Sequence, residues 1–300
     1  MRRIVIAALA VFLSVAPAMA APGDRALEDL RILSADDMGG RGIGTEGSAK
    51  ARAYIRGRFE QIGLTVVEQP FAFTRKRDGK EVHGVNLIVR IDGTAPGGKA
   101  IVVSAHYDHL GTQGGAIYNG ADDNASGVAG LLAVAEAFKA APPKHTVILV
   151  ALDGEESGLR GARAFVESPP APLADIGLNI NFDMLAKNAK GELYASGGAR
   201  NAWVKARLEA LAVSAPVSLK LGHDTGLDDD INNWTYQSDH GVFARAGVAW
   251  VYFGVEDHPE YHKPTDDFAT VPQDFFRKAV ATVVAAVRAF DDQLGAMPAR

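Results

Sequence analysis

The sequence contains no cysteine. Disulfide bonds and thiolate metal ligands are therefore excluded, and any metal ion must be held by histidine, aspartate or glutamate side chains. A lipid anchor attached to cysteine is excluded for the same reason. With 300 residues and 47% hydrophobic composition, the chain is long enough and apolar enough to form a stable core without covalent cross-links.

Positive charge is also scarce. The 31 lysines and arginines are outnumbered by 36 acidic residues, which gives a net charge of −5. A nucleic-acid partner is not expected, because such proteins carry a basic patch. The G-x-S-x-G motif of serine hydrolases is absent as well. No tandem repeat or flexible linker divides residues 21–300, so we expect them to form one domain.

The first 20 residues differ in kind from the rest. Arg2 and Arg3 precede an apolar stretch over 4–15, and Ala-Met-Ala closes the segment at 18–20. This pattern predicts a cleaved signal peptide and an exported protein, either periplasmic or extracellular. Because the apolar stretch falls short of the roughly 20 residues that cross a bilayer, we expect no stable membrane association after cleavage.

Strand-like and helix-like segments alternate along the remaining chain. Several of the predicted strands are short, unbroken apolar runs, which is typical of strands buried on both faces. We therefore predict an α/β fold, a three-layer α/β/α sandwich around a mostly parallel mixed central sheet. Strands are expected at 65–73, 85–91, 100–105, 146–152, 176–182 and 248–253, and helices at 48–62, 127–139, 158–167, 201–212 and 273–294.

Imidazole and carboxylate side chains follow these strands at the points where the strands end. In parallel sheets the carboxyl ends of the strands meet at one edge, where ligands bind. Five separate segments together deliver such groups, which indicates a divalent metal site. Histidine and carboxylate ligands without thiolate suit zinc, and cobalt or manganese less well. The residues are His106, Asp108, Asp122, Asp123, Glu155, Glu156, Asp183, His258 and His262.

The order of these motifs resembles that of the M28 family of zinc aminopeptidases. The matching stretches are "HYD", "GADDNASG", "GEE", "NFD" and "YHKPTDD", and "YQSDHGVF" and "GRGIGT" fit as well. The resemblance therefore covers nearly the whole chain after the predicted signal peptide.

The resemblance implies two zinc ions per chain. One zinc would bind His106 and Asp183, the other would bind Glu156 and His262, and Asp122 would bridge them. A bridging carboxylate holds two dications around a shared water or hydroxide. The resemblance also implies a cis peptide bond between Asp122 and Asp123.

Further roles follow from the same resemblance. Asp108 would fix the tautomer of the nearby imidazole, and Glu155 would be the general base. Tyr236 and Tyr261 both match positions where family members have a tyrosine near the substrate carbonyl, and Tyr236 is the favoured one. Three further histidines, His109, His223 and His240, are expected at the surface or behind the ligands.

The resulting expectation is an exported aminopeptidase that uses two zinc ions, a hydroxide and a glutamate base on peptides with a free amino terminus. Three alternatives stay open. One is a carboxypeptidase or dipeptidase of the same family, and a second is a glutaminyl-cyclase-like acyltransferase with one zinc. The third is a binding protein on an inactive scaffold.

Overall fold

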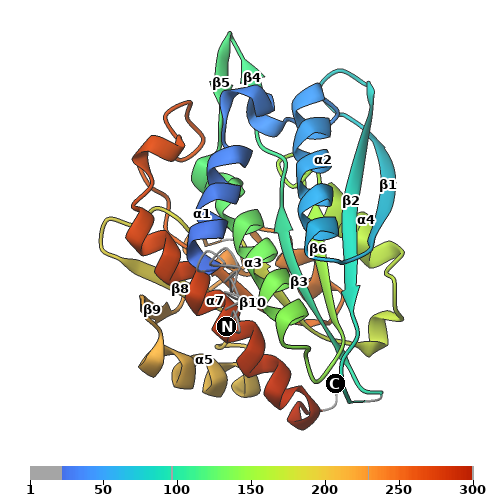
Figure 1. The fold of residues 1–300 in the computed structure, drawn as a ribbon, viewed down its shortest axis with the longest axis vertical. Helices are drawn as coiled ribbons and strands as arrows, with labels where there is room; N and C mark the ends of the chain where they lie inside the picture. The colour runs from blue at the N-terminus through green and yellow to red at the C-terminus, as the bar shows by residue number, and fades with distance from the viewer. Residues whose placement is uncertain (1–21, 96, 229, 299–300) are drawn as a thin grey trace, which may run out of the picture.

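The computed structural model describes residues 22–95, 97–228 and 230–298, so the predicted signal peptide lies outside the described residues. A mixed sheet of eight strands forms the centre of the molecule (Figure 1). Its strands are β1 (Val66–Thr74), β2 (Glu81–Ile91), β3 (Ala100–His106), β6 (Val147–Leu152), β7 (Ile176–Phe182), β8 (Glu192–Ser196), β9 (Ser218–Leu221) and β10 (Ala249–Gly254). Their spatial order is β1-β2-β6-β3-β7-β10-β8-β9.

The four central strands, β6, β3, β7 and β10, run parallel to one another. Their carboxyl ends are level, because His106 lies opposite Leu152 and Phe253 lies opposite Phe182. Every residue of β3, β6 and β7 is buried, as expected for strands covered on both faces. The segments that follow these strands therefore leave the sheet at one edge.

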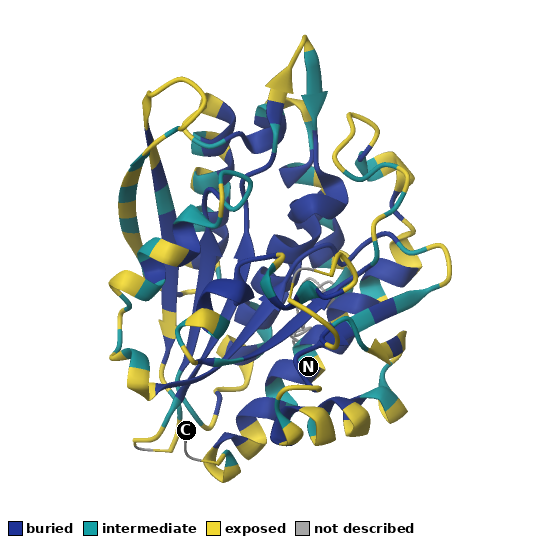
Figure 2. Cartoon of the chain, turned by 180° about the vertical axis from the view of Figure 1, so that it is seen from behind, coloured by how far each residue is buried: buried dark blue, intermediate teal, exposed yellow. Residues whose placement is uncertain are grey.

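Helices cover both faces of the sheet (Figures 1 and 2). Successive strand residues point to opposite faces, so Ile101 and Val103 enter one core while Val102 enters the other. The larger core contains side chains of α1 (Pro22–Leu33), α2 (Glu46–Gln61), α3 (Gly127–Ala140), α5 (Ala202–Ser214) and α7 (Gln273–Gln293), and the smaller contains those of α4 (Arg160–Glu167) and α6 (His240–Arg245). The predicted three-layer α/β/α architecture is confirmed.

The sequence did not predict several short elements. They are α1, α6, the strands β8 and β9, and a hairpin of β4 (Gly111–Gln113) and β5 (Ala116–Tyr118) that projects from the body in Figure 1. The strand expected at 85–91 also begins earlier, at Glu81, because its first residues pair with β1 through Phe73 and Val82. None of the helices in the described ranges is long and apolar enough to span a bilayer.

A buried ion pair joins three helices near the amino terminus. Arg58 on α2 donates to both carboxylate oxygens of Asp29 on α1, at 2.7 and 3.1 Å, and it also pairs with Glu136 on α3 at 2.5 Å. Asp29 is 1% exposed. These contacts join α1 to α2 and α3.

Asp29→Ala should lower the free energy of unfolding by about 3–5 kcal/mol, because it removes one partner of a buried ion pair. Glu28→Ala is the matched control on the same helix: its pair with Arg31 is solvent-exposed, and such pairs contribute about 0–1 kcal/mol. Urea unfolding of both variants measures the difference. Equal destabilisation by the two substitutions would contradict this role of Asp29.

Candidate metal centre

The edge where the central strands end gathers the predicted acidic and imidazole groups. His106 is the last residue of β3, Asp183 directly follows β7, and Glu156 lies just beyond β6. Asp123 comes from the irregular turn η2 (Ala121–Ser126) that leads into α3, and His262 comes from the loop after β10.

Asp123 lies between two groups of ligand atoms. Its Oδ1 is 3.5 Å from His106 Nε2, and that nitrogen is 3.2 Å from Asp183 Oδ1. Its Oδ2 is 3.0 Å from His262 Nε2, which is 3.5 Å from Glu156 Oε1. One carboxylate thus presents one oxygen to each group, the arrangement of a bridging metal ligand.

These separations fit zinc. Four ligand atoms at 2.0–2.1 Å from a tetrahedral zinc lie about 3.3 Å from one another, close to the distances around Asp123. His106 Nδ1 lies 3.1 Å from the backbone carbonyl of Asp108, which can only accept, so this nitrogen carries the proton. Nε2, which faces Asp123 and Asp183, is therefore free to bind a metal ion.

Electrostatics at the centre also favours a bound cation. Burial by itself would lower the pKa of His106, but the adjacent Asp183 carboxylate raises it well above its usual range. Burial, together with the nearby charge of Glu156, raises the pKa of Asp123. The pKa of Glu156 is lowered in spite of burial, because His109 and His262 hydrogen-bond to its carboxylate. The carboxylates thus depend on imidazoles for charge balance, a role that a divalent metal would fill.

Asp122, the predicted bridging residue, does not face this centre. Its Oδ1 accepts hydrogen bonds from the Ala186 amide at 2.6 Å and the Ser126 hydroxyl at 3.1 Å. Its Oδ2 accepts from the Lys187 amide at 3.1 Å and lies 3.1 Å from His258 Nε2. The structure therefore differs from the prediction by one residue: Asp123, rather than Asp122, lies between the two groups of candidate ligand atoms, and Asp122 hydrogen-bonds to the surrounding loops.

The cis peptide bond also lies one residue later than predicted. It joins Asp123 to Asn124 rather than Asp122 to Asp123. The turn is held from the far end of the chain. Asp266 accepts hydrogen bonds from the amides of Asp122 and Asp123 at 3.0–3.1 Å and pairs with Lys187 at 2.7 Å.

His109 lies closer to the centre than the sequence predicted. It is 2% exposed, so it is not a surface residue, and its Nδ1 lies 2.8 Å from Glu156 Oε1 and 3.7 Å from Asp123 Oδ2. Two histidines, His109 and His262, thus face the same pair of carboxylates. The sequence signal was the second histidine of "HYDHLG", three residues after His106.

The other two histidines lie elsewhere. His240 is fully buried and hydrogen-bonds to the Trp234 carbonyl at 2.8 Å, while His223 stacks on the Trp234 ring at 3.7 Å. Burial lowers the pKa of His240 to about 4, so this side chain is neutral at physiological pH.

Glu155 and Asp108 lie next to each other beside the candidate ligands. The Asp108 carboxylate accepts the Glu155 amide at 3.0 Å, and it lies 3.7 Å from His106 Nδ1. The carbonyl of Asp108, rather than its carboxylate, makes the short contact that orients this imidazole. Burial, with Asp239 and Asp183 nearby, raises the pKa of Glu155 well above its usual range. A carboxylate in such surroundings is suited to accept a proton.

Both predicted tyrosines line the cavity that opens onto the centre. This cavity has a volume of about 310 Å³, and Tyr236, Tyr261, Glu155 and His106 are among its lining residues. The Tyr261 ring stacks on His262 with a centroid distance of 3.9 Å, whereas the Tyr236 ring packs under the guanidinium of Arg245 at 4.1 Å. Both tyrosines thus border the cavity beside the candidate ligands.

A buried arginine hydrogen-bonds to the backbone segments that surround the centre. Arg41 has no exposed surface, and its guanidinium donates to five backbone carbonyls, those of Leu33, Tyr107, Asn119, Gly120 and Asp123. Burial lowers the pKa of Arg41 only to about 10, so it stays charged at neutral pH. Its guanidinium hydrogen-bonds both to the turn that contains Asp123 and to Tyr107, the residue directly after β3. These contacts connect the turn to the end of that strand.

Residues 86–287 match peptidase family M28. The chain belongs to this family. Membership identifies it as a hydrolase of the metallopeptidase class, and it confirms the resemblance on which the predicted site was based.

Comparison with three similar proteins extends this result. The chain is 28% identical over 249 residues to the alkaline phosphatase isozyme conversion protein of Escherichia coli, a match that covers 76% of this chain and 71% of that protein. Its fold is similar to a zinc aminopeptidase of Bacillus subtilis, with a TM-score of 0.73 or 0.72 in two structures, 18% identity, and coverage of 88% and 94% of the two chains. It is equally similar to the glutaminyl cyclase of Bacteroides thetaiotaomicron, with a TM-score of 0.73, 19% identity, and coverage of 89% and 97%.

The two neighbouring aspartates can be distinguished by metal content. Asp123→Asn is expected to lose most of the bound zinc, because both groups of ligand atoms share this carboxylate, while Asp122→Asn should keep zinc and lose thermal stability. Elemental analysis and thermal unfolding of both variants test this. A folded Asp122→Asn protein without zinc, beside an Asp123→Asn protein with zinc, would restore the original assignment.

Proposed function

We propose that this M28 peptidase is an aminopeptidase that holds two zinc ions. The observation that carries the proposal is the position of Asp123, whose two oxygens each face one group of ligand atoms. His106 and Asp183 would complete one metal site, and Glu156 with His262 would complete the other. His109 would either orient Glu156 by donating to its carboxylate or replace His262 as ligand.

Bound zinc would supply a Lewis acid for the scissile carbonyl and for an attacking water. Glu155 would take the proton of that water and pass it to the leaving amine, as a general base and then a general acid. The Asp108 carboxylate fixes the backbone of Glu155 by accepting its amide hydrogen bond. Tyr236 or Tyr261 would donate a hydrogen bond to the carbonyl oxygen as its negative charge develops.

A free amino terminus fits the hydrogen-bond acceptors that line the cavity. Asp123, Glu155, Glu156 and Asp183 all line it, and their oxygens can accept hydrogen bonds from a peptide ammonium. This feature favours cleavage at the amino-terminal peptide bond over a carboxypeptidase reaction. We also propose that the protein is exported, on the basis of the amino-terminal signal pattern.

The second candidate is a glutaminyl cyclase, because such an enzyme has an equally similar fold. We expect that acyl transfer to need one zinc. The two sets of ligand atoms around Asp123 support the two-metal peptidase instead, and the candidates differ in their products.

Activity should depend on metal and on the free amine. Hydrolysis of leucine-, alanine- and arginine-nitroanilide is expected to fall to background in excess chelator and to return with zinc, and amino-acetylated forms should not be cleaved. Peptides that begin with glutamine should yield free glutamine rather than a cyclised product. Cleavage unaffected by chelator, or equal rates on acetylated substrates, would contradict the proposal.

The paired glutamates should separate proton transfer from metal binding. Glu155→Gln is expected to keep its zinc and lose kcat by about 10²–10⁴-fold, the usual contribution of a general base. Glu156→Gln should bind less zinc, with activity partly restored by added metal. Zinc stoichiometry measured beside kcat for both variants tests the division. Loss of zinc in Glu155→Gln alone would show that the two roles are exchanged.

A further inference from the structure

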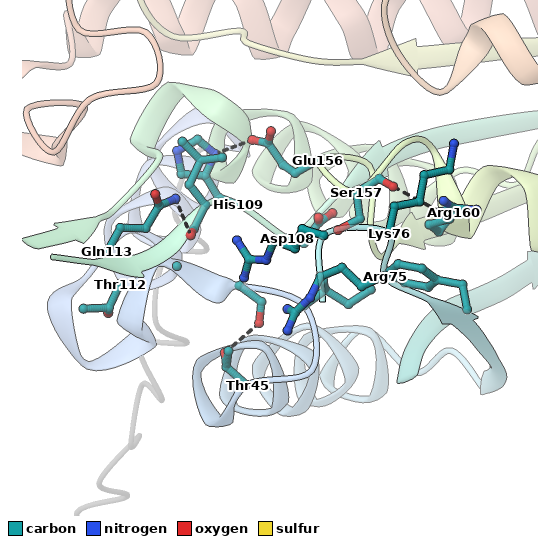
Figure 3. Close-up of a pocket in the computed structure, with 16 residues that line it drawn as sticks. Thr45, Arg75, Lys76, Asp108, His109, Thr112, Gln113, Glu156, Ser157 and Arg160 are labelled. Carbon is teal, nitrogen blue, oxygen red and sulfur yellow. Dashed lines mark hydrogen bonds and ion pairs between the residues drawn. The ribbon is translucent and has the colours of Figure 1, made fainter. Parts of the chain in front are cut away.

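A second, larger cavity lies beside the metal centre. Its volume is about 670 Å³, and Asp108, His109 and Glu156 form the wall that it shares with the centre. The rest is formed by the loop between β1 and β2, the turn before α2, the β4–β5 hairpin and the start of α4 (Figure 3). A cavity of this size can hold several atoms of a peptide beyond the scissile bond.

Positive charge is concentrated on the wall opposite His109. Arg75, Lys76 and Arg77 come from the loop after β1, and Arg160 comes from the first turn of α4. Figure 3 shows Arg75, Lys76 and Arg160 grouped on one side of the cavity and His109 on the other. Arg75 is paired with Asp78 at 2.6 Å. Within the described ranges, Lys76, Arg77 and Arg160 have no carboxylate at ion-pair distance.

Arg160 is the best oriented of these groups. Its Nε donates to the Ser157 carbonyl at 3.1 Å, and its guanidinium lies 4.6 Å from the centre of the Phe73 ring. These contacts fix the plane of the guanidinium, and its two terminal nitrogens have no hydrogen-bond partner among the described residues. Ser157 directly follows Glu156, so Arg160 is anchored to the turn that carries the metal ligand.

A guanidinium with two unpaired, parallel donors is suited to bind a carboxylate through both of its oxygens. The cavity is acidic near Glu156 and basic near Arg160, so it is complementary to a molecule with an amine at one end and a carboxylate farther along. A peptide with an acidic side chain or a free carboxyl terminus has this distribution of charge.

We propose that Arg160 binds a carboxylate of the peptide substrate and gives the enzyme a preference for anionic peptides. The inference rests on the proposed function, because the cavity reaches the scissile bond only if the metal centre is the catalytic site. The carboxylate can belong to an aspartate or glutamate side chain or to the peptide terminus, and the two sources can be distinguished with matched peptides.

The test compares kcat/KM for tripeptides that carry glutamate or glutamine at the first, second or third position, each with a free or an amidated carboxyl terminus. Arg160→Gln is measured beside Arg160→Lys and the control Arg163→Gln. Arg163 lies on the same helix and also donates its Nε to a backbone carbonyl, at 3.1 Å, but it does not line the cavity. Zinc content and thermal unfolding verify that each variant is folded and loaded.

We expect the wild-type protein to prefer glutamate over glutamine at one position, or the free over the amidated terminus. Arg160→Gln should reduce that ratio roughly 10- to 100-fold, the usual effect of losing a charged hydrogen bond. Arg160→Lys should retain part of the preference, and Arg163→Gln should retain all of it. The peptide pair whose ratio falls identifies the source of the carboxylate.

An unchanged ratio in Arg160→Gln would overturn the inference, and so would an equal fall in Arg163→Gln, which would indicate a general effect of charge. A wild-type protein that cleaves none of the peptides would contradict the proposed function instead. In that case, calorimetric binding of the glutamate and glutamine peptides to the same variants decides whether Arg160 binds a carboxylate.

Discussion

Mutual repulsion among buried carboxylates is the constraint on which this structure depends. Asp108, Asp123 and Asp183 are withdrawn from water at one edge of the sheet, with Glu155 and Glu156 beside them. Charges brought this close in a poorly solvated site need compensating cations. Histidines supply part of the compensation from the front, and the guanidinium of Arg41 supplies part from behind. The negative charge that remains is suited to a divalent metal ion. Hydrogen bonds within the surrounding loops hold the acidic residues in place in the absence of the metal.

The central strands of the sheet could be predicted because the hydrophobic pattern that identifies them lies within each strand's own sequence. Strands buried on both faces are mostly apolar, so β6 appears as a continuous hydrophobic run, and β3 and β7 appear as hydrophobic runs interrupted by a few buried polar residues. The elements that escaped prediction lack this signal. β9 is mostly exposed, and β8 is a short, partly exposed strand stabilised by pairing with β10 and β9. Such segments become strands only because a sheet edge is already present, which no local pattern reveals.

The same distinction applies to the site. Residues at strand ends, such as His106 and Asp183, could be predicted because the parallel sheet determines where they emerge. The choice between Asp122 and Asp123 could not, since both occupy one irregular turn and only its backbone course decides which carboxylate points inward. His109 was missed for a related reason, because its burial depends on the packing of a loop rather than on its position in the sequence.

The contact between Asp266 and the turn at 122–123 spans 144 residues of sequence. Long-range contacts of this kind form late, because a large loop of chain must close before they gain any stabilisation. The four parallel strands are complete by Gly254, whereas the residue that secures the central turn follows them. The position of Asp123 in the centre therefore depends on a segment that contributes no strand to the sheet, so the sheet by itself does not define the site.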